Sequence, residues 1–281
     1  MNHKFSTQMF TSLVTVIGGS LLTLAFQSTA LAQQHERGVD HHVHAKINSS
    51  HKITNPLAQG YHLTFQSVFK GKTLNRKKWI TSYPDNQRTH SNNEQEYYAD
   101  KNVVVSNGML SLVATAKPMG GMKYTSGMIA SYGHFFQKYG LFEIRAKFPA
   151  GKGYWPAFWL LPEDKSWPPE IDILEILGNQ PDKVYLTNHY SENGRPAGKG
   201  GFYVGPDFSA GFHTFSLKWT PTKLVWYVDG VARYQTTENI PHVPMYVIAN
   251  LAVGGDWPGM PDQSTVFPGK MQIKWIRVYQ K

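Results

Sequence analysis

The chain has 281 residues, with 28 Lys and Arg against 19 Asp and Glu, and no cysteine. This length suits one large domain and a leader, and the missing cysteine excludes a disulfide-stabilised fold. A domain of about 220 residues buries a full core without such cross-links. The formal net charge of +9 suits nucleic acid, a membrane surface or an acidic polymer. No nucleic-acid motif and no amphipathic basic helix accompanies it, so we expect neither nucleic acid nor a membrane as partner.

Residues 1–32 have the pattern of a secretory signal peptide. Lys4 is their only charged residue, an apolar stretch runs from Met9 to Phe26, and Ala30-Leu31-Ala32 supplies small residues for cleavage. A membrane anchor is the alternative, but Thr, Ser and Gly interrupt the apolar stretch, which is short for a span of about 20 residues. We expect cleavage after Ala32, secretion to an extracellular or periplasmic location, and a mature net charge of +8.

Residues 33–59 are polar, rich in His and without periodicity, which is typical of a flexible lead-in. The His residues could bind a metal ion. Because no feature of the segment fixes their geometry, we favour a solvated linker. The folded domain is then expected to span residues 60–281.

After residue 60 the pattern is that of short β-strands. Asn107-Gly108 and Asp229-Gly230 each separate two apolar segments rich in β-branched residues, which is a strong hairpin signal. Helical periodicity is scarce, and Gly, Pro and Asn turns separate the other segments. We therefore predict an all-β fold built as a sandwich of antiparallel sheets.

Three carboxylates fall within the run Glu170-Ile171-Asp172-Ile173-Leu174-Glu175. Polar residues at period two predict a strand with Glu170 and Asp172 on one face. Glu175 is one residue out of phase, and a β-bulge would return it to that face. An exposed acidic strand face is the alternative, but like charges along one strand repel each other. The crowding therefore favours a catalytic site whose acids titrate as a coupled set.

A carboxylate pair without metal or cysteine can cleave glycosidic bonds. One carboxylate attacks the anomeric carbon, and a second, protonated, donates to the leaving oxygen. Retaining enzymes hold the two carboxyls about 5–5.5 Å apart. Glu170 and Glu175 are the candidates for this pair. Asp172 lies between them, where it would hydrogen-bond the nucleophile and hold the acid's proton by its charge.

The acid run resembles the signature of family 16 glycoside hydrolases, in the version with an extra residue found in laminarinase-like members. The resemblance covers about residues 61–281 and implies a jelly roll (concanavalin A-like), two curved antiparallel sheets with a cleft on the concave one. It also implies Glu170 as nucleophile and Glu175 as acid/base. Further segments similar to the family, in the family's order, are residues 93–98, 126–129, 139–147, 153–162 and 275–279.

Aromatic and polar side chains are expected to line this cleft. Trp155 and Trp159 are four residues apart, so on one strand they share a face, and sugar rings pack on aromatic planes. The alternative is a pair of core tryptophans, but the family uses both positions near the cleaved bond. The resemblance implies four more substrate-binding residues: His189 near the acid/base, Asn250 and Trp257 on the other side of the cleft, and Asn93 in a rim loop.

Two segments depart from the family pattern. Gln66 and Lys274 stand where acids usually bind a structural calcium ion, so we expect no metal and no cofactor. Residues 191–202 have the composition of a Gly-rich, basic loop over the product side of the cleft. Together with Lys123, this loop, which contains Arg195 and Lys199, resembles bacterial relatives that cut acidic exopolysaccharides more than those that cut plain β-1,3-glucan.

The sequence thus predicts a secreted, monomeric, retaining endo-β-glycanase whose partner is its polysaccharide, a β-1,3/1,4-glucan or an acidic exopolysaccharide. The basic surplus favours the acidic polymer, cut less well as salt rises. A carbohydrate-binding jelly roll without catalysis is one alternative, against which the intact Glu170 and Glu175 argue. A transglycosylase with the same site is another, and product length would distinguish it.

Overall fold

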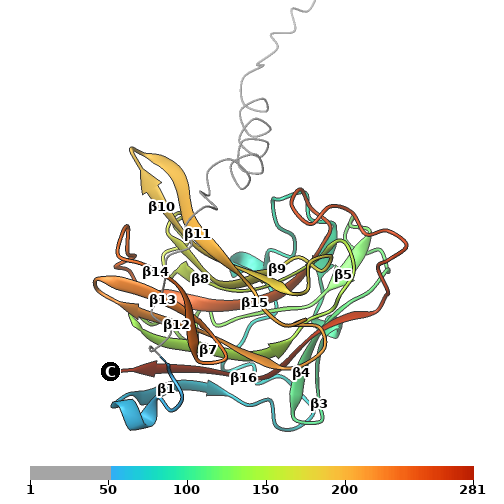
Figure 1. The fold of residues 1–281 in the computed structure, drawn as a ribbon. Coiled ribbons are helices and arrows are strands. Elements are labelled where there is room, and N and C mark those ends of the chain that lie inside the picture. Colours follow the sequence, from blue (N-terminus) through green and yellow to red (C-terminus); the bar gives the residue numbers. More distant parts are fainter. Residues whose placement is uncertain (1–51) are drawn as a thin grey trace, which may run out of the picture.

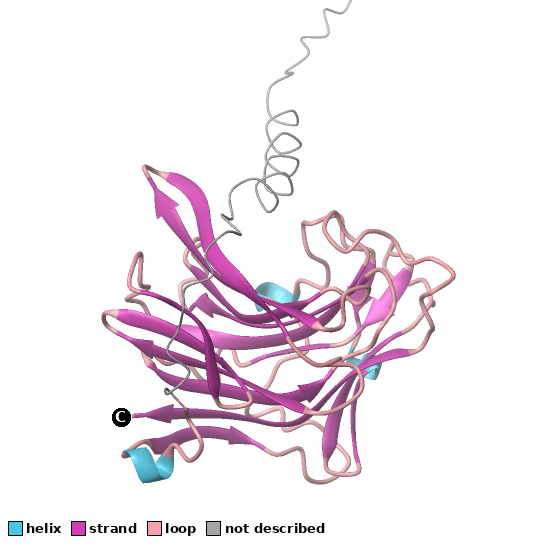
Figure 2. Ribbon diagram, in the orientation of Figure 1, coloured by secondary structure: helices cyan, strands magenta, loops and turns pink. Residues whose placement is uncertain are grey.

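The computed structural model describes residues 52–281 (Figure 1). Two antiparallel sheets lie face to face, and strands dominate the chain (Figure 2). The helices in this part are three short 3-10 turns, η1 (Leu57–Gln59), η2 (Pro84–Asn86) and η3 (Asp100–Asn102). No helix among the described residues is long and apolar enough to cross a membrane. The predicted all-β jelly-roll sandwich is confirmed.

The first sheet has eight strands in the order β14-β13-β12-β7-β16-β4-β3, and β1 pairs with β16 as well. Its long central strand β16 ends the chain and holds β7 and β4 on its two sides. The strands are β1 (His62–Ser67), β3 (Val103–Ser106), β4 (Met109–Ala114), β7 (Gly140–Lys147), β12 (His213–Thr220), β13 (Lys223–Val228), β14 (Val231–Thr236) and β16 (Gly269–Gln280).

The second sheet has six strands in the order β11-β10-β9-β8-β15-β6 and carries the acid run on β9. A separate parallel pair, β2 with β5, lies in the segment that precedes β6. The strands are β6 (Met128–Ala130), β8 (Tyr154–Pro162), β9 (Glu170–Ile176), β10 (Lys183–Glu192), β11 (Arg195–Val204) and β15 (Met245–Val253), with β2 (Glu96–Tyr98) and β5 (Tyr124–Ser126).

Both predicted hairpins are present. Asn107 and Gly108 join β3 to β4 with φ of 50° and 70°, and Asp229 and Gly230 join β13 to β14 with φ of 49° and 76°. Positive φ at both central residues is the turn geometry that matches strand twist. These turns fix the register of the first sheet at both of its ends.

The prediction that residues 191–202 form a loop over the cleft is wrong. The segment is a third hairpin, in which Asn193 and Gly194 turn β10 into β11 and Glu192 pairs with Arg195. It extends beyond the rest of the second sheet as a two-stranded arm (Figure 1). The two strands therefore form an unbroken ladder from Lys183 to Val204, in which successive side chains point to alternate faces of the sheet.

The fold begins before residue 60. Lys52 bridges to Val231, and the backbone N–H of Ile53 donates to the carbonyl of Gly230 at 2.9 Å. Ile53 also packs against Leu141 and other side chains of the first sheet. The last part of the expected flexible lead-in therefore belongs to the domain. The expected signal peptide and the rest of the lead-in lie outside the described residues.

Candidate active site

The acid strand carries the predicted bulge. Asp172 lies opposite Trp159 and Glu175 opposite Ala157, so three steps on β9 match two steps on β8. The register with β10 shifts at the same place. Ile173 and Leu174 both enter the core between the sheets. The extra residue is absorbed there, and Glu175 returns to the face of Glu170 and Asp172.

The strand is also fixed from behind. Trp226 of β13, in the other sheet, donates its indole N–H to the carbonyl of Asp172 at 2.8 Å. Ile171, Ile173 and Leu174 are at most 1% exposed. Packing on the core side thus holds the backbone from which the three acids project into the cleft.

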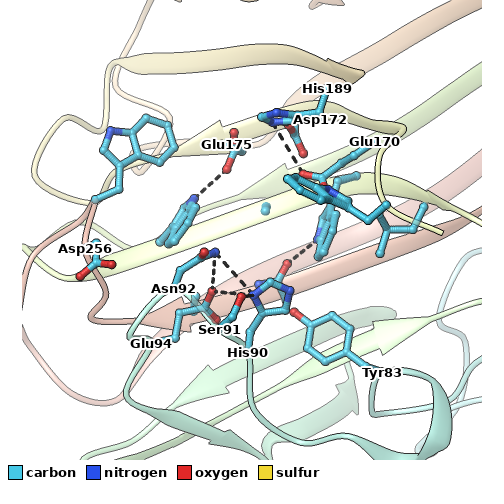
Figure 3. Close-up of a pocket in the computed structure, with 18 residues that line it drawn as sticks. Tyr83, His90, Ser91, Asn92, Glu94, Glu170, Asp172, Glu175, His189 and Asp256 are labelled. Carbon is cyan, nitrogen blue, oxygen red and sulfur yellow. Dashed lines mark hydrogen bonds and ion pairs between the residues drawn. The ribbon is translucent and has the colours of Figure 1, made fainter. Parts of the chain in front are cut away.

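Each glutamate accepts a hydrogen bond from a tryptophan. Trp167, in the loop before β9, donates its indole N–H to Glu170 Oε2 at 2.7 Å. Trp155 of β8 donates to Glu175 Oε1 at 3.0 Å. Both carboxyl groups are thereby oriented on a cleft wall that also contains Asp172 and His189 (Figure 3).

His189 lies beside the acids at one end of the run. It pairs with Glu170 across the β9–β10 ladder, and its Nε2 lies 3.0 Å from Asp172 Oδ2 and 3.8 Å from Glu170 Oε1. The expectation put this imidazole near Glu175. The structure places it against the other two acids, because His189 lies opposite Glu170 in the ladder while Tyr185 lies opposite Glu175.

Burial raises the pKa of all three acids. It raises the pKa of Glu170 to about 8, helped by the charge of Asp172 and opposed by His189 and by the Trp167 hydrogen bond. Burial also raises the pKa of Asp172 to about 7. For Glu175, burial and then the charges of Asp172 and Glu170 raise the pKa well above its usual range. Neither Lys nor Arg is among the described residues that line the pocket. His189 and the Trp167 indole favour the charged form of Glu170, whereas the charges of Asp172 and Glu170 favour a proton on Glu175.

Trp155 and Trp159 lie on the cleft face of β8, as predicted. Ala157 and Leu161 share this face and line the same pocket. Each of these residues is 7% exposed, so both tryptophans are packed in buried clusters and also line the pocket. Trp159 donates to Asn250 Oδ1 at 2.8 Å, and the Asn250 amide donates to the Tyr98 hydroxyl at 2.9 Å. Asn250 therefore fixes the ring plane of Trp159.

Asn93 stands at the rim, outside the residues that line the pocket. It has a φ of 55°, and its amide donates to both oxygens of Asp256 at 2.8 and 3.0 Å. Asn93 thus connects two rim segments, and its direct contact with substrate stays a prediction. Its neighbour Asn92 lines the pocket instead, as does Trp257 on the other segment.

Comparison with known proteins agrees with this geometry. Residues 87–277 match the model of glycosyl hydrolases family 16. The chain belongs to glycosyl hydrolase family 16. It is 39% identical over 206 residues to the endo-1,3-1,4-beta-glycanase ExsH of Rhizobium meliloti, covering 67% of this chain and 44% of that protein. It is also 34% identical over 214 residues to a beta-glucanase of Rhodothermus marinus, covering 67% of this chain and 75% of that one.

A solved structure gives the same result. The catalytic domain of an endo-1,3-beta-glucanase (laminarinase) from Thermotoga petrophila superposes with a TM-score of 0.72 at 36% identity, over 79% of this chain and 98% of that one. The family 16 chain spans less than half the length of the Rhizobium meliloti relatives it matches.

Several residues of this family 16 cleft were not found from the sequence as site residues. They come from loops whose place in the cleft depends on tertiary packing. Trp167 gave a signal, since it stands three residues before the acid run, and Glu94 lies in the segment 93–98 that resembles the family. The residues are Tyr83, His90, Ser91, Asn92, Glu94, Trp167 and Asp256.

Arg195 and Lys199, near the tip of the β10–β11 arm, do not face the cleft. Lys199 pairs with Asn188, and directly opposed residues of an antiparallel ladder share a face. The amide of Asn188 donates to the carbonyl of Asn239 behind the sheet, while its neighbour His189 faces the cleft. Lys199 itself is 2.7 Å from Glu238. Arg195 lies four residues before Lys199 on the same strand, so its side chain points to the same face of the sheet.

Two groups bear on metal binding. Glu170, Asp172 and His189 offer ligand atoms that lie within 4.8 Å of one another. A divalent cation bound there would occupy the space that a sugar needs to reach Glu170. At the position where the family pattern has an acid that binds calcium, the Lys274 ammonium lies 4.5 Å from the centre of the Phe212 ring. That the domain needs no metal or cofactor stays a prediction.

Proposed function

We propose that this family 16 domain is a retaining endo-β-glycanase that hydrolyses internal bonds of a neutral β-1,3- or mixed β-1,3-1,4-glucan. The observation that carries the proposal is the bulged strand β9, which brings Glu170, Asp172 and Glu175 to one cleft face. The different surroundings of the two glutamates support different roles for them.

Glu170 is the nucleophile in this mechanism, and Glu175 is the acid/base. Glu170 attacks the anomeric carbon while Glu175 gives its proton to the leaving oxygen, so the glycosidic bond breaks as the glycosyl–Glu170 ester forms. Glu175, now a carboxylate, takes a proton from water, and that water cleaves the ester. Asp172 keeps the proton on Glu175 by its charge, since it raises the pKa of that carboxyl.

The charge of the cleft supports a neutral sugar. The described residues that line the pocket include five carboxylates and neither Lys nor Arg. An acidic sugar at these subsites would meet like charges without a partner cation. A neutral hexose instead brings hydroxyl donors, which carboxylates accept.

Relatives support the choice of linkage. The Rhizobium meliloti proteins are endo-1,3-1,4-beta-glycanases, and the Thermotoga petrophila domain is a laminarinase. We also propose export through the leader of residues 1–32 and a monomeric state.

The test is a substrate panel with the purified mature chain. Laminarin, a mixed-linkage β-glucan, a galactan and an acidic exopolysaccharide are digested, and products are followed by mass and by new reducing ends. We expect short neutral oligosaccharides from one of the glucans, with β reducing ends appearing first in proton NMR. Early α product would exclude retention, and faster cutting of the acidic polymer would exclude the neutral substrate. Products longer than the substrate would indicate a transglycosylase, and binding without cleavage a carbohydrate-binding module.

A further inference from the structure

Two glutamates outside the catalytic run are buried next to the cleft. Glu94 is 5% exposed and Glu96, the first residue of β2, is completely buried. They are two residues apart, with Gln95 between them. Glu94 lines the pocket on the wall opposite Glu170, Asp172 and Glu175, together with Asn92 and His90 (Figure 3).

The segment that carries them is fixed to strand β15. The N–H of Gln95 donates to the carbonyl of Val253 at 2.8 Å, and the N–H of Val253 donates to Glu96 Oε2 at 2.8 Å. Gly254 follows, and a Cβ there would come within 2.9 Å of the Gln95 side chain. The position of the two carboxyl groups is therefore set by backbone contacts.

Glu94 has two polar neighbours on its cleft side. The Asn92 amide donates to Glu94 Oε1 at 3.3 Å, and His90 Nδ1 lies 3.5 Å from the same oxygen. The other oxygen, Oε2, and Glu96 Oε1 are buried and receive no donor from residues 52–281. Both Glu94 and the Tyr98 hydroxyl are near enough to Glu96 to affect its carboxyl group. A proton shared by Glu94 and Glu96 would give these two oxygens a partner.

The surroundings favour such a proton. Burial, then the charge of Glu94 and its hydrogen bond, raise the pKa of Glu96 well above its usual range. Two adjacent buried anions would be costly, and neither Lys nor Arg is among the described residues that line the cleft. Glu96 has a structural role, since it accepts the Val253 N–H, whereas Glu94 lines the cleft. An unbalanced buried acid pair costs stability, which the bond to Val253 alone does not explain.

We propose that Glu94 and Glu96 share one proton, and that this carboxyl pair binds a hydroxyl group of the sugar that lies between Trp159 and the catalytic acids. A singly protonated pair both donates and accepts, which matches the two hydrogen-bonding roles of a hydroxyl. Glu94 is then a substrate-positioning residue on the wall that faces the reacting bond. This inference rests on the proposed glycanase function.

The pair also acts on the acid/base through its charge. Glu94 is one of the charges that raise the pKa of Glu175. Its negative charge therefore helps Glu175 to keep the proton that the leaving oxygen receives. The titratable groups that surround Glu94 come from its own loop, from β2, from the segment after β1, from the rim after β15 and from β9: His90, Glu96, Tyr98, Tyr83, Asp256 and Glu175.

The test compares Glu94→Gln, Glu96→Gln and a surface control, Glu163→Gln, on the best glucan of the panel. Glu94→Gln should raise KM about tenfold or more, because a bond to a charged acceptor is lost, and should move the alkaline limb of the kcat/KM profile to lower pH. In Glu96→Gln the new amide donates to Glu94 and leaves it with the whole charge. That limb should then move to higher pH, with a smaller rise in KM. Glu163 is exposed, and its variant should match the wild type.

If the two glutamates had only a structural role, Glu94→Gln and Glu96→Gln would not shift the alkaline limb of the kcat/KM profile in opposite directions. If both cleft variants only lose thermal stability, while KM and the limb stay as in the wild type, the pair is structural and the inference is wrong. Equal displacement of the limb by both variants would exclude proton sharing. An inactive wild type would instead overturn the proposed function, so the two failures are distinct.

Discussion

Each of the three acids proposed for catalysis is held by a different neighbour. Trp167 donates to Glu170, Trp155 donates to Glu175, and His189 lies against Asp172. The three side chains are all carboxyl groups, and their different neighbours suit them to different roles. Burial and the charges of Asp172 and Glu170 raise the pKa of Glu175 well above its usual range, and in the proposed mechanism Glu175 is the group that holds a proton at the start of the reaction.

Replacing either glutamate by glutamine should leave folding intact and abolish most activity. For Glu175→Gln we expect kcat to fall by about 10²–10⁴-fold, since proton transfer to the leaving oxygen is lost. Glu170→Gln should lose at least as much, because no glycosyl ester forms. Asp172→Asn should be severe but partial, since Asp172 only tunes its neighbours. Initial rates on the best glucan measure all three.

Azide distinguishes the two glutamates. With Glu170→Ala, azide should restore turnover by direct attack and give the α-glycosyl azide. With Glu175→Ala, azide should intercept the ester on Glu170 and give the β-glycosyl azide. Proton NMR of the products decides, and near-normal turnover of both variants without azide would contradict the assignment.

The buried acids should make stability depend on pH. Burial raises the folded-state pKa of Glu170 to about 8 and of Asp172 to about 7, from about 4 in the unfolded chain. The folded state therefore binds more protons, and their contribution to stability is present below pH 4 and is lost as pH rises through 7 to 8. Wild-type Tm should fall over this window, relative to Glu170→Gln.

Thermal melts from pH 4 to 9 measure this difference. We expect the Glu170→Gln variant to gain over the wild type at pH 8, at about 2–4 °C per kcal/mol for a domain of this size. At pH 4 the gain should vanish. Glu163→Gln provides the control, since Glu163 is exposed, and an equal gain for it would assign the effect to net charge.

The acid triad was predictable because its information is local. Alternation in the run places Glu170 and Asp172 together, and the misplaced phase of Glu175 requires a bulge, which the register shows. Glu94 lies in a segment that resembles the family, but its place in the cleft was not predictable from local spacing. Its position depends on the contact of its loop with Val253, more than 150 residues away, and no spacing in the sequence records such a contact.

The same distinction holds for strands. The Asn-Gly and Asp-Gly turns predicted their hairpins because two residues with positive φ determine the pairing. Residues 191–202 were mistaken for a loop because of their glycines. A Cβ on Gly200 would lie 2.6 Å from the Leu186 carbonyl, and one on Gly201 would lie 2.8 Å from the Tyr234 ring. Glycine there provides space for close packing of strands.

Deleting Leu174 tests the role of the bulge. The shortened run would read Glu-Ile-Asp-Ile-Glu, and regular alternation would place all three acids on the cleft face without an extra residue. We expect detectable glycanase activity, with about 2–5 kcal/mol less stability from the lost core side chain. Chemical denaturation and glucan assays measure the two effects.

An insertion supplies the contrast. One Ala added after Ile171 would send the following acid into the core and should abolish both folding and activity. If the deletion variant is as inactive as the insertion, the bulge has a role beyond restoring the face of Glu175.

At the scale of the whole domain, no Lys or Arg among residues 52–281 lines the pocket, and Arg195 and Lys199 lie away from it. Lys199 pairs with Glu238 and Arg195 shares its parity, both away from the acids. Replacing both by Ser should leave kcat/KM on a neutral glucan, and its response to salt, within error of the wild type. Assays at low and physiological ionic strength check this. If the double variant lost activity only on an acidic polymer, Arg195 and Lys199 would be substrate-binding residues and the prediction would be wrong.

The absence of Lys and Arg among the described residues that line the cleft also has a consequence for inhibition. A sugar mimic that carries a ring ammonium would bind in a cleft lined by carboxylates, where no Lys or Arg of the described lining residues competes with it. Its affinity should grow as those acids ionise, up to the pH at which the amine itself loses its proton. Such a compound would therefore bind best on the alkaline side of the enzyme's own optimum, where the natural substrate is processed more slowly.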